Sequence, residues 1–216
     1  MKFASFAERA AAMEAEPADL ETVALVSDLF AAAEDDLAVV ARFVQGRVFP
    51  AWDERKLDVG PSTCYTAIAR AAGPNVGADD VEARVAEVGE VGAVAAEYEF
   101  GGQTGLDAFG AGGGGDDRTV TSVYGDLVAL ASTEGTGSES AKVDRLFGLF
   151  NESEGREARY LARLVLAEMR IGVGEGTVRD AIADAFDVPV DAVERALQVS
   201  NDYGLVAETA RNEGEA

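Results

Sequence analysis

Histidine is absent from this chain of 216 residues, and cysteine occurs once, at Cys64. Without histidine, the chain can form no Ser-His-Asp triad, no Cys-His pair and no HExxH zinc motif. A single cysteine excludes an internal disulfide and a cysteine-rich zinc site. No apolar run approaches the roughly 18 residues that span a bilayer, and charges interrupt the N-terminus too early for a signal peptide. We therefore expect a soluble, cytoplasmic protein.

Basic residues are also scarce, because 18 lysines and arginines stand against 40 aspartates and glutamates, giving a net charge of −22. Ordinary solubility is one interpretation of this charge. We favour adaptation to a cytoplasm with molar salt, where dense carboxylates keep a protein hydrated and repulsion is screened over about 3 Å at 1 M. Such a charge at first argues against a nucleic-acid ligand, because phosphate contacts depend on basic residues.

The charge is, however, unevenly distributed along the chain. Residues 140–180 contain seven basic and seven acidic side chains, so the remaining residues carry the whole net charge of −22. A smaller patch that is neutral to basic surrounds Arg42, Arg47, Arg55 and Lys56. These two stretches lack the net negative charge of the rest of the chain, and we expect the first of them to bind an anionic ligand.

Helical periodicity dominates the chain and sustained period-two alternation is absent, so we expect an all-α fold. The helices predicted from periodicity span residues 3–16, 20–33, 37–48, 61–72, 79–88, 91–98, 119–131, 140–150, 156–171, 177–186, 190–200 and 201–211. Asp19 is expected to cap the second helix, and Pro61 to occupy the first turn of the fourth. Apolar residues make up 48% of the chain, which is enough to form a substantial core.

Eight glycines crowd residues 101–117. Such a run cannot hold regular structure, so we expect a flexible glycine-rich loop between helical lobes at residues 1–100 and 118–216 of one domain, 1–216. No Lys-Ser or Lys-Thr follows the glycines, which disfavours a phosphate-binding P-loop.

Four arginines distinguish the predicted helix 156–171. Arg156, Arg159, Arg163 and Arg170 project within about 60° of one another at ~100° per residue. A solvated face with intrahelical salt bridges is one interpretation, but the glutamates of this helix are poorly placed to pair with the arginines. Because stacked like charges destabilise a helix unless an anion neutralises them, we favour a surface that binds a polyanion. The alternative is an all-α adaptor that docks an acidic protein partner through the same stripe.

Glycines at 172, 174 and 176 alternate directly after this helix. They predict a tight turn leading into the next helix, whose unpaired N–H groups and dipole would attract phosphate. A dinucleotide-binding fingerprint is rejected, because the third glycine comes one residue early and a helix precedes it. A helix-hairpin-helix module, which binds the DNA backbone without regard to sequence, fits better. A simple helix C-cap at Gly172 is the alternative.

Taken together, these motifs resemble the N-terminal DNA-binding domain of ATP-dependent DNA ligases of the archaeal and eukaryotic type. The segments that carry the resemblance are FVQGRVFP at 43–50 with LDVG at 57–60, GEVGAVA at 89–95, GTGSESAK at 135–142, and the run from EARYLARLV through MRIGVGEGTV to AIADAF at 157–186. They follow the order of the family and cover most of residues 40–200, and the acidity indicates a haloarchaeal member.

The resemblance implies a domain that grips the minor groove and phosphates around a nick, while a nucleotidyltransferase domain and an OB domain close around the DNA. In that family the lysine of a K-x-D-G motif attacks ATP, and sealing requires Mg²⁺. Residues 56–60 miss this motif because the glycine comes one residue late. We therefore expect no catalytic residue, cofactor or metal in this segment, and no ligation by it alone.

The implied partners are nicked double-stranded DNA, the other two domains of the ligase and, as an open alternative, a sliding clamp. The implied processes are DNA replication, repair and recombination, and the domain is expected to be a monomer that does not bind membranes. The DNA-binding residues assigned from the charge pattern and the resemblance together are Ser138, Lys142, Arg159, Arg163, Arg170, Gly172, Gly174 and Thr177.

Three positions depart from the family pattern. Ala167 and Glu168 stand where the family often has Gly followed by Lys or Arg, and Glu139 stands where it has Gln. Each change puts a neutral or acidic group in place of an implied phosphate contact. At molar salt, where counterion release contributes little, we expect binding to depend on directed Arg–phosphate bonds and backbone amides.

Overall fold

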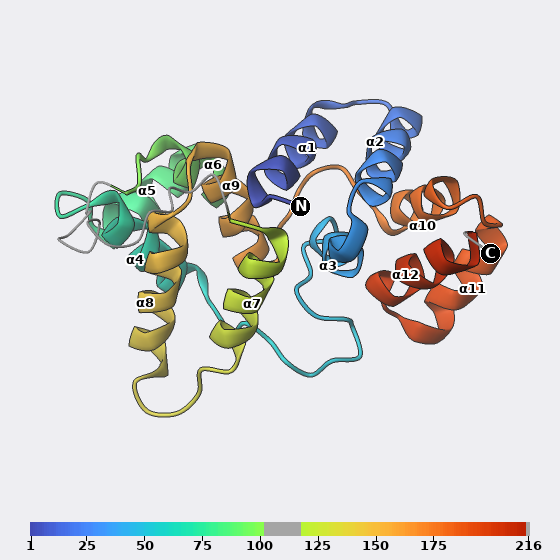
Figure 1. The fold of residues 1–216 in the computed structure, drawn as a ribbon. Coiled ribbons are helices and arrows are strands. Elements are labelled where there is room, and N and C mark those ends of the chain that lie inside the picture. The colour runs from blue at the N-terminus through green and yellow to red at the C-terminus, as the bar shows by residue number, and fades with distance from the viewer. Residues whose placement is uncertain (102–117, 215–216) are drawn as a thin grey trace. The chain divides into compact units, whose positions relative to one another are not determined.

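The computed structural model describes residues 1–101 and 118–214, and its regular elements are all helices, which confirms the all-α prediction (Figure 1). In chain order they are α1 (Phe3–Ala15), α2 (Asp19–Ala31), the short 3-10 helix η1 (Glu34–Asp36), α3 (Leu37–Phe43), α4 (Pro61–Ala72), α5 (Ala78–Val88), α6 (Val91–Glu97), α7 (Val120–Ala131), α8 (Ser138–Asn151), α9 (Gly155–Val165), α10 (Glu175–Ala185), α11 (Val190–Ser200) and α12 (Tyr203–Gly214). Over these described ranges, no helix has both the length and the hydrophobicity to cross a lipid bilayer. The predicted loop at 101–117 lies outside the described residues, apart from Gly101.

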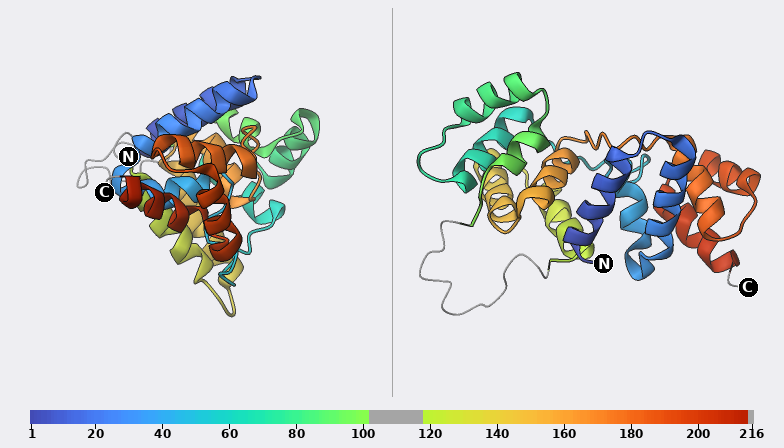
Figure 2. Two further views of the ribbon diagram at one scale, coloured as in Figure 1. Left: turned by 90° about the vertical axis from the view of Figure 1, so that its right-hand side faces the viewer. Right: turned by 90° about the horizontal axis from the view of Figure 1, so that it is seen from above.

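The helices form two compact units, which Figure 2 shows from two further sides. The terminal unit, built from both ends of the chain, contains Phe3–Arg55 and Met169–Ala216, and the central unit contains Lys56–Glu168. This division differs from the expected lobes 1–100 and 118–216, because helices pair across the predicted loop. In the terminal unit α10 packs on α2 and α12 on α3, and in the central unit α6 packs on α9 and α4 on α8.

Phenylalanine rings form the core of the terminal unit near the N-terminus. Phe3, Phe6 and Phe43 are buried; the first two rings stack with centroids 5.8 Å apart, and Phe43 meets Phe6 edge-on at 5.9 Å. Such ring pairs add about 1 kcal/mol beyond the burial of their area. At the beginning of α12, Gly204 permits close packing on α3, because a Cβ there would lie 2.5 Å from the carbonyl oxygen of Ala38.

The core of the central unit is supplied by four different helices. Its fully buried large side chains include Ile68 of α4, Leu127 of α7, Leu146 and Phe150 of α8, and Tyr160 of α9. Truncating a side chain of this size in a packed core costs about 3 kcal/mol, since the cavity is only partly refilled. The helices that carry the candidate site are therefore held in fixed positions within this unit.

Two predicted helix boundaries differ from the structure for clear local reasons. The helix predicted over 37–48 ends at Phe43, because Gly46 adopts a left-handed conformation with φ of +66° and turns the chain. The expected cap Asp19 is already inside α2, and the residue at the N-cap is Ala18, which has no side chain to bond the first amides. Asp19 still favours the helix, since a negative charge in the first turn interacts well with the helix dipole.

Candidate nucleic-acid interface

The helix expected to carry all four arginines, α9, ends at Val165. Ala167 adopts a left-handed φ of +55°, and the amides of residues 167 and 168 donate to carbonyls of the last turn at 3.1 and 2.8 Å. These two hydrogen bonds form a Schellman motif, which terminates a helix at a left-handed residue. The prediction of a helix through Ile171 is therefore wrong, and Arg170 does not lie on the arginine stripe.

Arg163 lies inside the central unit rather than on its surface. Only 2% of the residue is exposed, and its Nε and Nη2 each donate to the carboxylate of Glu90 at 3.1 Å. Its guanidinium carbon also lies 5.3 Å from the centre of the Tyr160 ring. Arg163 therefore holds α9 against α6, which corrects its assignment as a phosphate contact.

Glu90, the partner of Arg163, was not identified from the sequence. Its carboxylate accepts hydrogen bonds from the amides of Gly92 at 2.5 Å and Ala93 at 2.7 Å, and so caps α6. Burial by itself raises the pKa of Glu90, but Arg163 and the two amides outweigh burial and hold this pKa below its ordinary value. The available signal was an acidic residue directly before a helix, within the segment 89–95 that resembles the ligase family.

Gly92 brings α6 and α9 into close contact. A Cβ at this position would lie 2.6 Å from the carbonyl oxygen of Arg159 and 3.0 Å from Cγ of Arg163. The side chain of Arg159 is one-third exposed, and its Nη2 lies 3.9 Å from Oε2 of Glu90. Arg159 therefore combines access to solvent with a carboxylate that orients it, and Arg156 at the beginning of α9 is exposed.

Lys142 is also buried in the central unit. The residue is 6% exposed, and its Nζ donates to the carbonyl oxygens of Leu57 at 2.9 Å and Asp58 at 3.0 Å and to the Asp58 carboxylate at 3.3 Å. An ammonium group has three donors, and these three acceptors account for all of them. Lys142 therefore fixes the backbone that leads into α4, which corrects its assignment as a DNA contact.

The glycine-rich loop before α8 is open to solvent. Gly135 and Gly137 are exposed and left-handed, with φ of +89° and +83°, a conformation that glycine adopts without strain. Ser138, the first residue of α8, is half-buried, and the N-cap residue Gly137 offers no side chain to the first amides. The amide of Ser138 donates to the carbonyl oxygen of Gly135 at 3.1 Å, so the predicted phosphate contact here rests on its hydroxyl and on the amides that follow it, because helix N-termini bind oxyanions.

In the terminal unit, the segment that follows α9 lines a shallow hollow of about 270 Å³ together with Val44 and Gln45. Arg170 and Gly172 in this segment are exposed and left-handed, with φ of +52° and +73°. Gln45 donates from Nε2 to the carbonyl oxygen of Gly174 at 3.3 Å, and this bond steadies the residue before α10. The hollow therefore brings a guanidinium and two glycine residues to one surface.

The start of α10 contains groups that favour the binding of a phosphate and one group that opposes it. Gly174 is the N-cap residue and has no side chain to bond the first amides, while Thr177 lies half-buried in the first turn. Glu175 in the same turn would repel a phosphate, although Arg47 offsets its charge from 3.9 Å. Burial and then the charge of Glu175 raise the pKa of Tyr203, so this tyrosine stays neutral at ordinary pH.

The predicted helix-hairpin-helix also needs correction. It connects α9 of the central unit to α10 of the terminal unit through residues 166–174, so the connection is longer than the expected short hairpin. Six of the eight predicted residues are exposed or half-exposed: Ser138 and Arg159 in the central unit, and Arg170, Gly172, Gly174 and Thr177 in the terminal unit. In the described ranges, no three His, Cys, Asp or Glu side chains are grouped so that they could hold a metal ion.

Comparison with known proteins identifies relatives of the whole chain. A family model described as DNA ligase N terminus matches residues 2–183. The chain is 65% identical to a DNA ligase of Haloarcula marismortui, 66% to one of Natronomonas pharaonis and 68% to one of Halobacterium salinarum. These alignments cover 99–100% of the chain but 38–39% of the ligases, so the chain spans about two fifths of the length of these curated relatives.

Proposed function

Because the chain belongs to the DNA ligase N-terminal family, we propose that it is the duplex-binding domain of an ATP-dependent DNA ligase. In this role it grips DNA on both sides of a nick and acts as a monomer. The remainder of the ligase, with its nucleotidyltransferase and OB domains, supplies the reactive lysine and binds ATP and Mg²⁺. The ligase would seal nicks left by replication, repair and recombination in a cytoplasm with high salt.

One observation carries the proposal: the stretch without net charge in a chain of −22 contains the exposed anion-binding groups. Arg170 lies on the hollow that Gly172 and Gly174 also line, and Gly174 directly precedes the uncapped N-terminus of α10. Guanidinium groups and helix-terminal amides bind phosphate through directed hydrogen bonds. Because such contacts reach the backbone of DNA, they position a protein on the duplex without reading its sequence.

Duplex binding by variants of Arg170 tests this proposal. We expect Arg170→Ala to weaken binding of a labelled nicked duplex about tenfold in fluorescence anisotropy at a fixed KCl concentration, equally for unrelated sequences. Arg170→Gly, which fits the left-handed backbone better, should show the same loss, because the loss comes from the guanidinium.

Arg195→Ala is the matched control, since Arg195 is an exposed arginine of α11 that does not line the hollow. This control should bind like the unchanged chain. Absence of duplex binding by the unchanged chain, or equal affinities for it and for Arg170→Ala, would overturn the proposal. Tighter binding to an acidic peptide than to the duplex would instead assign the arginines to an acidic protein partner.

A further inference from the structure

We propose that Trp52 is an additional contact with duplex DNA, its indole lying against the sugar and base edges of one strand. This inference rests on the proposed function and adds a residue that neither the arginine stripe nor the glycine segments include. Trp52 is the single tryptophan of the chain, and it is 64% exposed. Tryptophan is highly buried on average and is enriched among the residues that dominate binding energies at interfaces.

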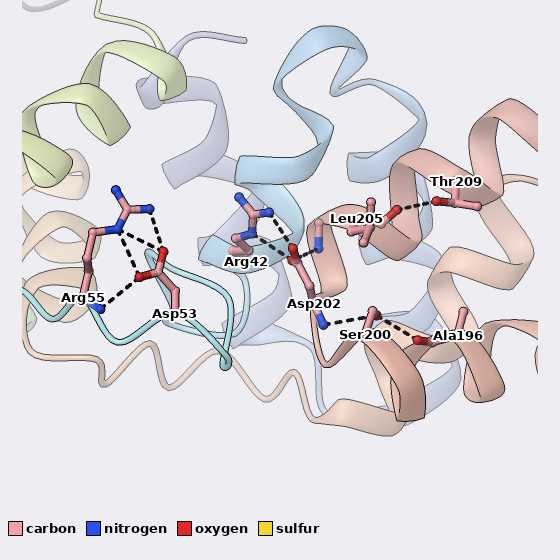
Figure 3. Close-up of polar contacts among 9 residues, drawn as sticks. Arg42, Asp53, Arg55, Ala196, Ser200, Asp202, Leu205 and Thr209 are labelled. Carbon is pink, nitrogen blue, oxygen red and sulfur yellow. Dashed lines mark hydrogen bonds and ion pairs between the residues drawn. The ribbon is translucent and has the colours of Figure 1, made fainter.

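Hydrogen bonds order the turn that carries Trp52, residues 50–53. The amide of Asp53 donates to the carbonyl oxygen of Pro50 at 3.0 Å and closes the turn. The side chain of Asp53 accepts three hydrogen bonds from the Arg55 guanidinium at 2.6–3.1 Å and a fourth from the Arg55 amide at 2.9 Å (Figure 3). A large ring on a fixed turn loses little conformational entropy on binding, so most of its contact energy is kept.

A second set of bonds ties this turn to the α11–α12 junction of the terminal unit. The amide of Ala51 donates to the carbonyl oxygen of Asn201 at 3.4 Å. The next residue, Asp202, accepts from Nε and Nη2 of Arg42 at 2.9 Å each, and Figure 3 shows this bidentate pair beside the start of α12. The Asp202 side chain also accepts from the amide of Gly204 at 3.0 Å. The junction that supports the turn is therefore fixed as well.

This junction connects the Trp52 turn with the proposed DNA contacts at the start of α10. Asn201 lines a hollow of about 540 Å³ together with Glu175 and Gly176, the first two residues of α10. Gly174, the residue before them, belongs to the hollow that also holds Arg170. The Trp52 turn therefore bonds a residue of one hollow, and the N-terminus of α10 links that hollow to the one that holds Arg170, all within the terminal unit.

The chemistry around the turn suits nucleic acid. Residues 42–56 contain four basic and two acidic side chains in a chain of −22. In the terminal unit Arg42 pairs with Asp202 and Arg55 with Asp53, whereas the Arg47 side chain is 39% exposed and lies 3.9 Å from Glu175, so it is the cation of this unit nearest in sequence to Trp52 that a phosphate can reach. The guanidinium of Arg55 lies 4.4 Å from the centre of the Phe49 ring and is held there by the Asp53 carboxylate. In the minor groove of a duplex, sugars and base edges offer apolar surface against which an indole packs without regard to sequence. An acidic peptide offers the charge but no such surface.

The emission of the chain reports on Trp52 alone, which makes a direct test practical. We titrate the chain with an unlabelled nicked duplex while exciting the indole outside the absorption of DNA, and measure quenching by acrylamide. The inference predicts that a saturating duplex lowers the acrylamide quenching constant at least twofold. A poly-glutamate peptide at the same charge concentration should leave it unchanged. Protection by the peptide and not by the duplex would overturn the inference in favour of a protein partner.

Variants supply the second arm of the test. Trp52→Ala should weaken binding of the labelled duplex about tenfold in anisotropy, and Trp52→Phe should keep most of the affinity, because a flat ring remains. Leu20→Ala is the matched control, since Leu20 is 83% exposed on α2 and outside the Trp52 turn. Circular dichroism melting curves verify that each variant is folded.

The outcomes also separate this inference from the proposed function on which it rests. Duplex binding with unchanged acrylamide quenching and with no loss in Trp52→Ala would overturn the role of Trp52 and leave the proposed function standing. Absence of duplex binding by the unchanged chain would overturn the proposed function, and the role of Trp52 with it.

Discussion

Two of the cations that the sequence singles out, Lys142 and Arg163, have structural roles in the central unit. Lys142 bonds the backbone 85 residues earlier in the chain, and Arg163 bonds Glu90, 73 residues earlier. Sequence spacing identifies a cation and the helix face it belongs to, but it does not show which distant acceptors will meet it. Arg170 lies in an exposed segment, so the structure leaves its predicted contact with a phosphate open to test.

The bond between Glu90 and Arg163 predicts a change in stability. Glu90→Gln keeps an acceptor for the α6 amides but leaves a buried guanidinium without its counter-charge, so we expect a loss of about 3 kcal/mol in the free energy of unfolding at pH 7. Urea unfolding at fixed KCl measures this loss. Salt should change it little, because buried pairs are weakly screened.

The same variant predicts a pH dependence with a definite sign. The folded pKa of Glu90 lies below the ordinary value of a glutamate carboxyl, so its stabilisation is fully present above the unfolded pKa and is lost as pH falls through the folded pKa. The difference between the unchanged chain and Glu90→Gln should therefore shrink below about pH 4.5. A difference that stays constant from pH 7 to pH 3 would argue against this role of the carboxylate.

A variant of Lys142 distinguishes a structural role of this residue from a contact with DNA. Lys142→Met should lower the free energy of unfolding by about 2 kcal/mol, because the part-buried carbonyl oxygens of Leu57 and Asp58 lose their donor. It should leave the slope of log affinity against log KCl unchanged for duplex binding. A slope reduced by about one unit would show instead that the ammonium neutralises a phosphate.

At the scale of the elements, periodicity predicted where the helices lie, whereas their ends depended on backbone geometry that residue type indicates only weakly. In α9 the left-handed residue that ends the helix is Ala167, so the usual glycine signal is missing from the sequence. In α3 the ending glycine, Gly46, was present, but the apolar pattern continues through Val48 and Phe49, which are buried without being helical. Long-range packing therefore hides the boundary in this case.

The close contact of α6 with α9 predicts opposite effects for two glycines. Gly92→Ala should destabilise the chain by about 2 kcal/mol or more, because its Cβ would meet the backbone oxygen of Arg159 at 2.6 Å and force the helices apart. Gly125→Ala in α7 is the matched control, since nothing lies within 4 Å of the added Cβ. The control should gain up to about 1 kcal/mol from helix propensity. Thermal melting of both variants tests this, and equal shifts would contradict the close contact.

At the scale of the whole molecule, helical periodicity was sufficient to predict the fold class, and the order of the motifs was sufficient to predict the family. They did not predict the two units, because these depend on contacts such as α2 with α10 that join distant parts of the chain. The net charge of −22 belongs to sequence outside 140–180, where it suits a protein dissolved in concentrated salt. Inside that stretch, burial of Lys142 and Arg163 leaves fewer cations exposed than the sequence suggests.

Duplex affinity as a function of KCl concentration tests the central claim most directly. Anisotropy of a labelled nicked duplex, measured from low salt to molar KCl, gives both the affinity and the number of phosphates neutralised. With so few exposed cations, we predict a shallow log–log slope, no steeper than about −3, and binding that persists in molar KCl. Absence of duplex binding at every KCl concentration, or preference for an acidic peptide, would contradict the assignment of the neutral stretch to DNA.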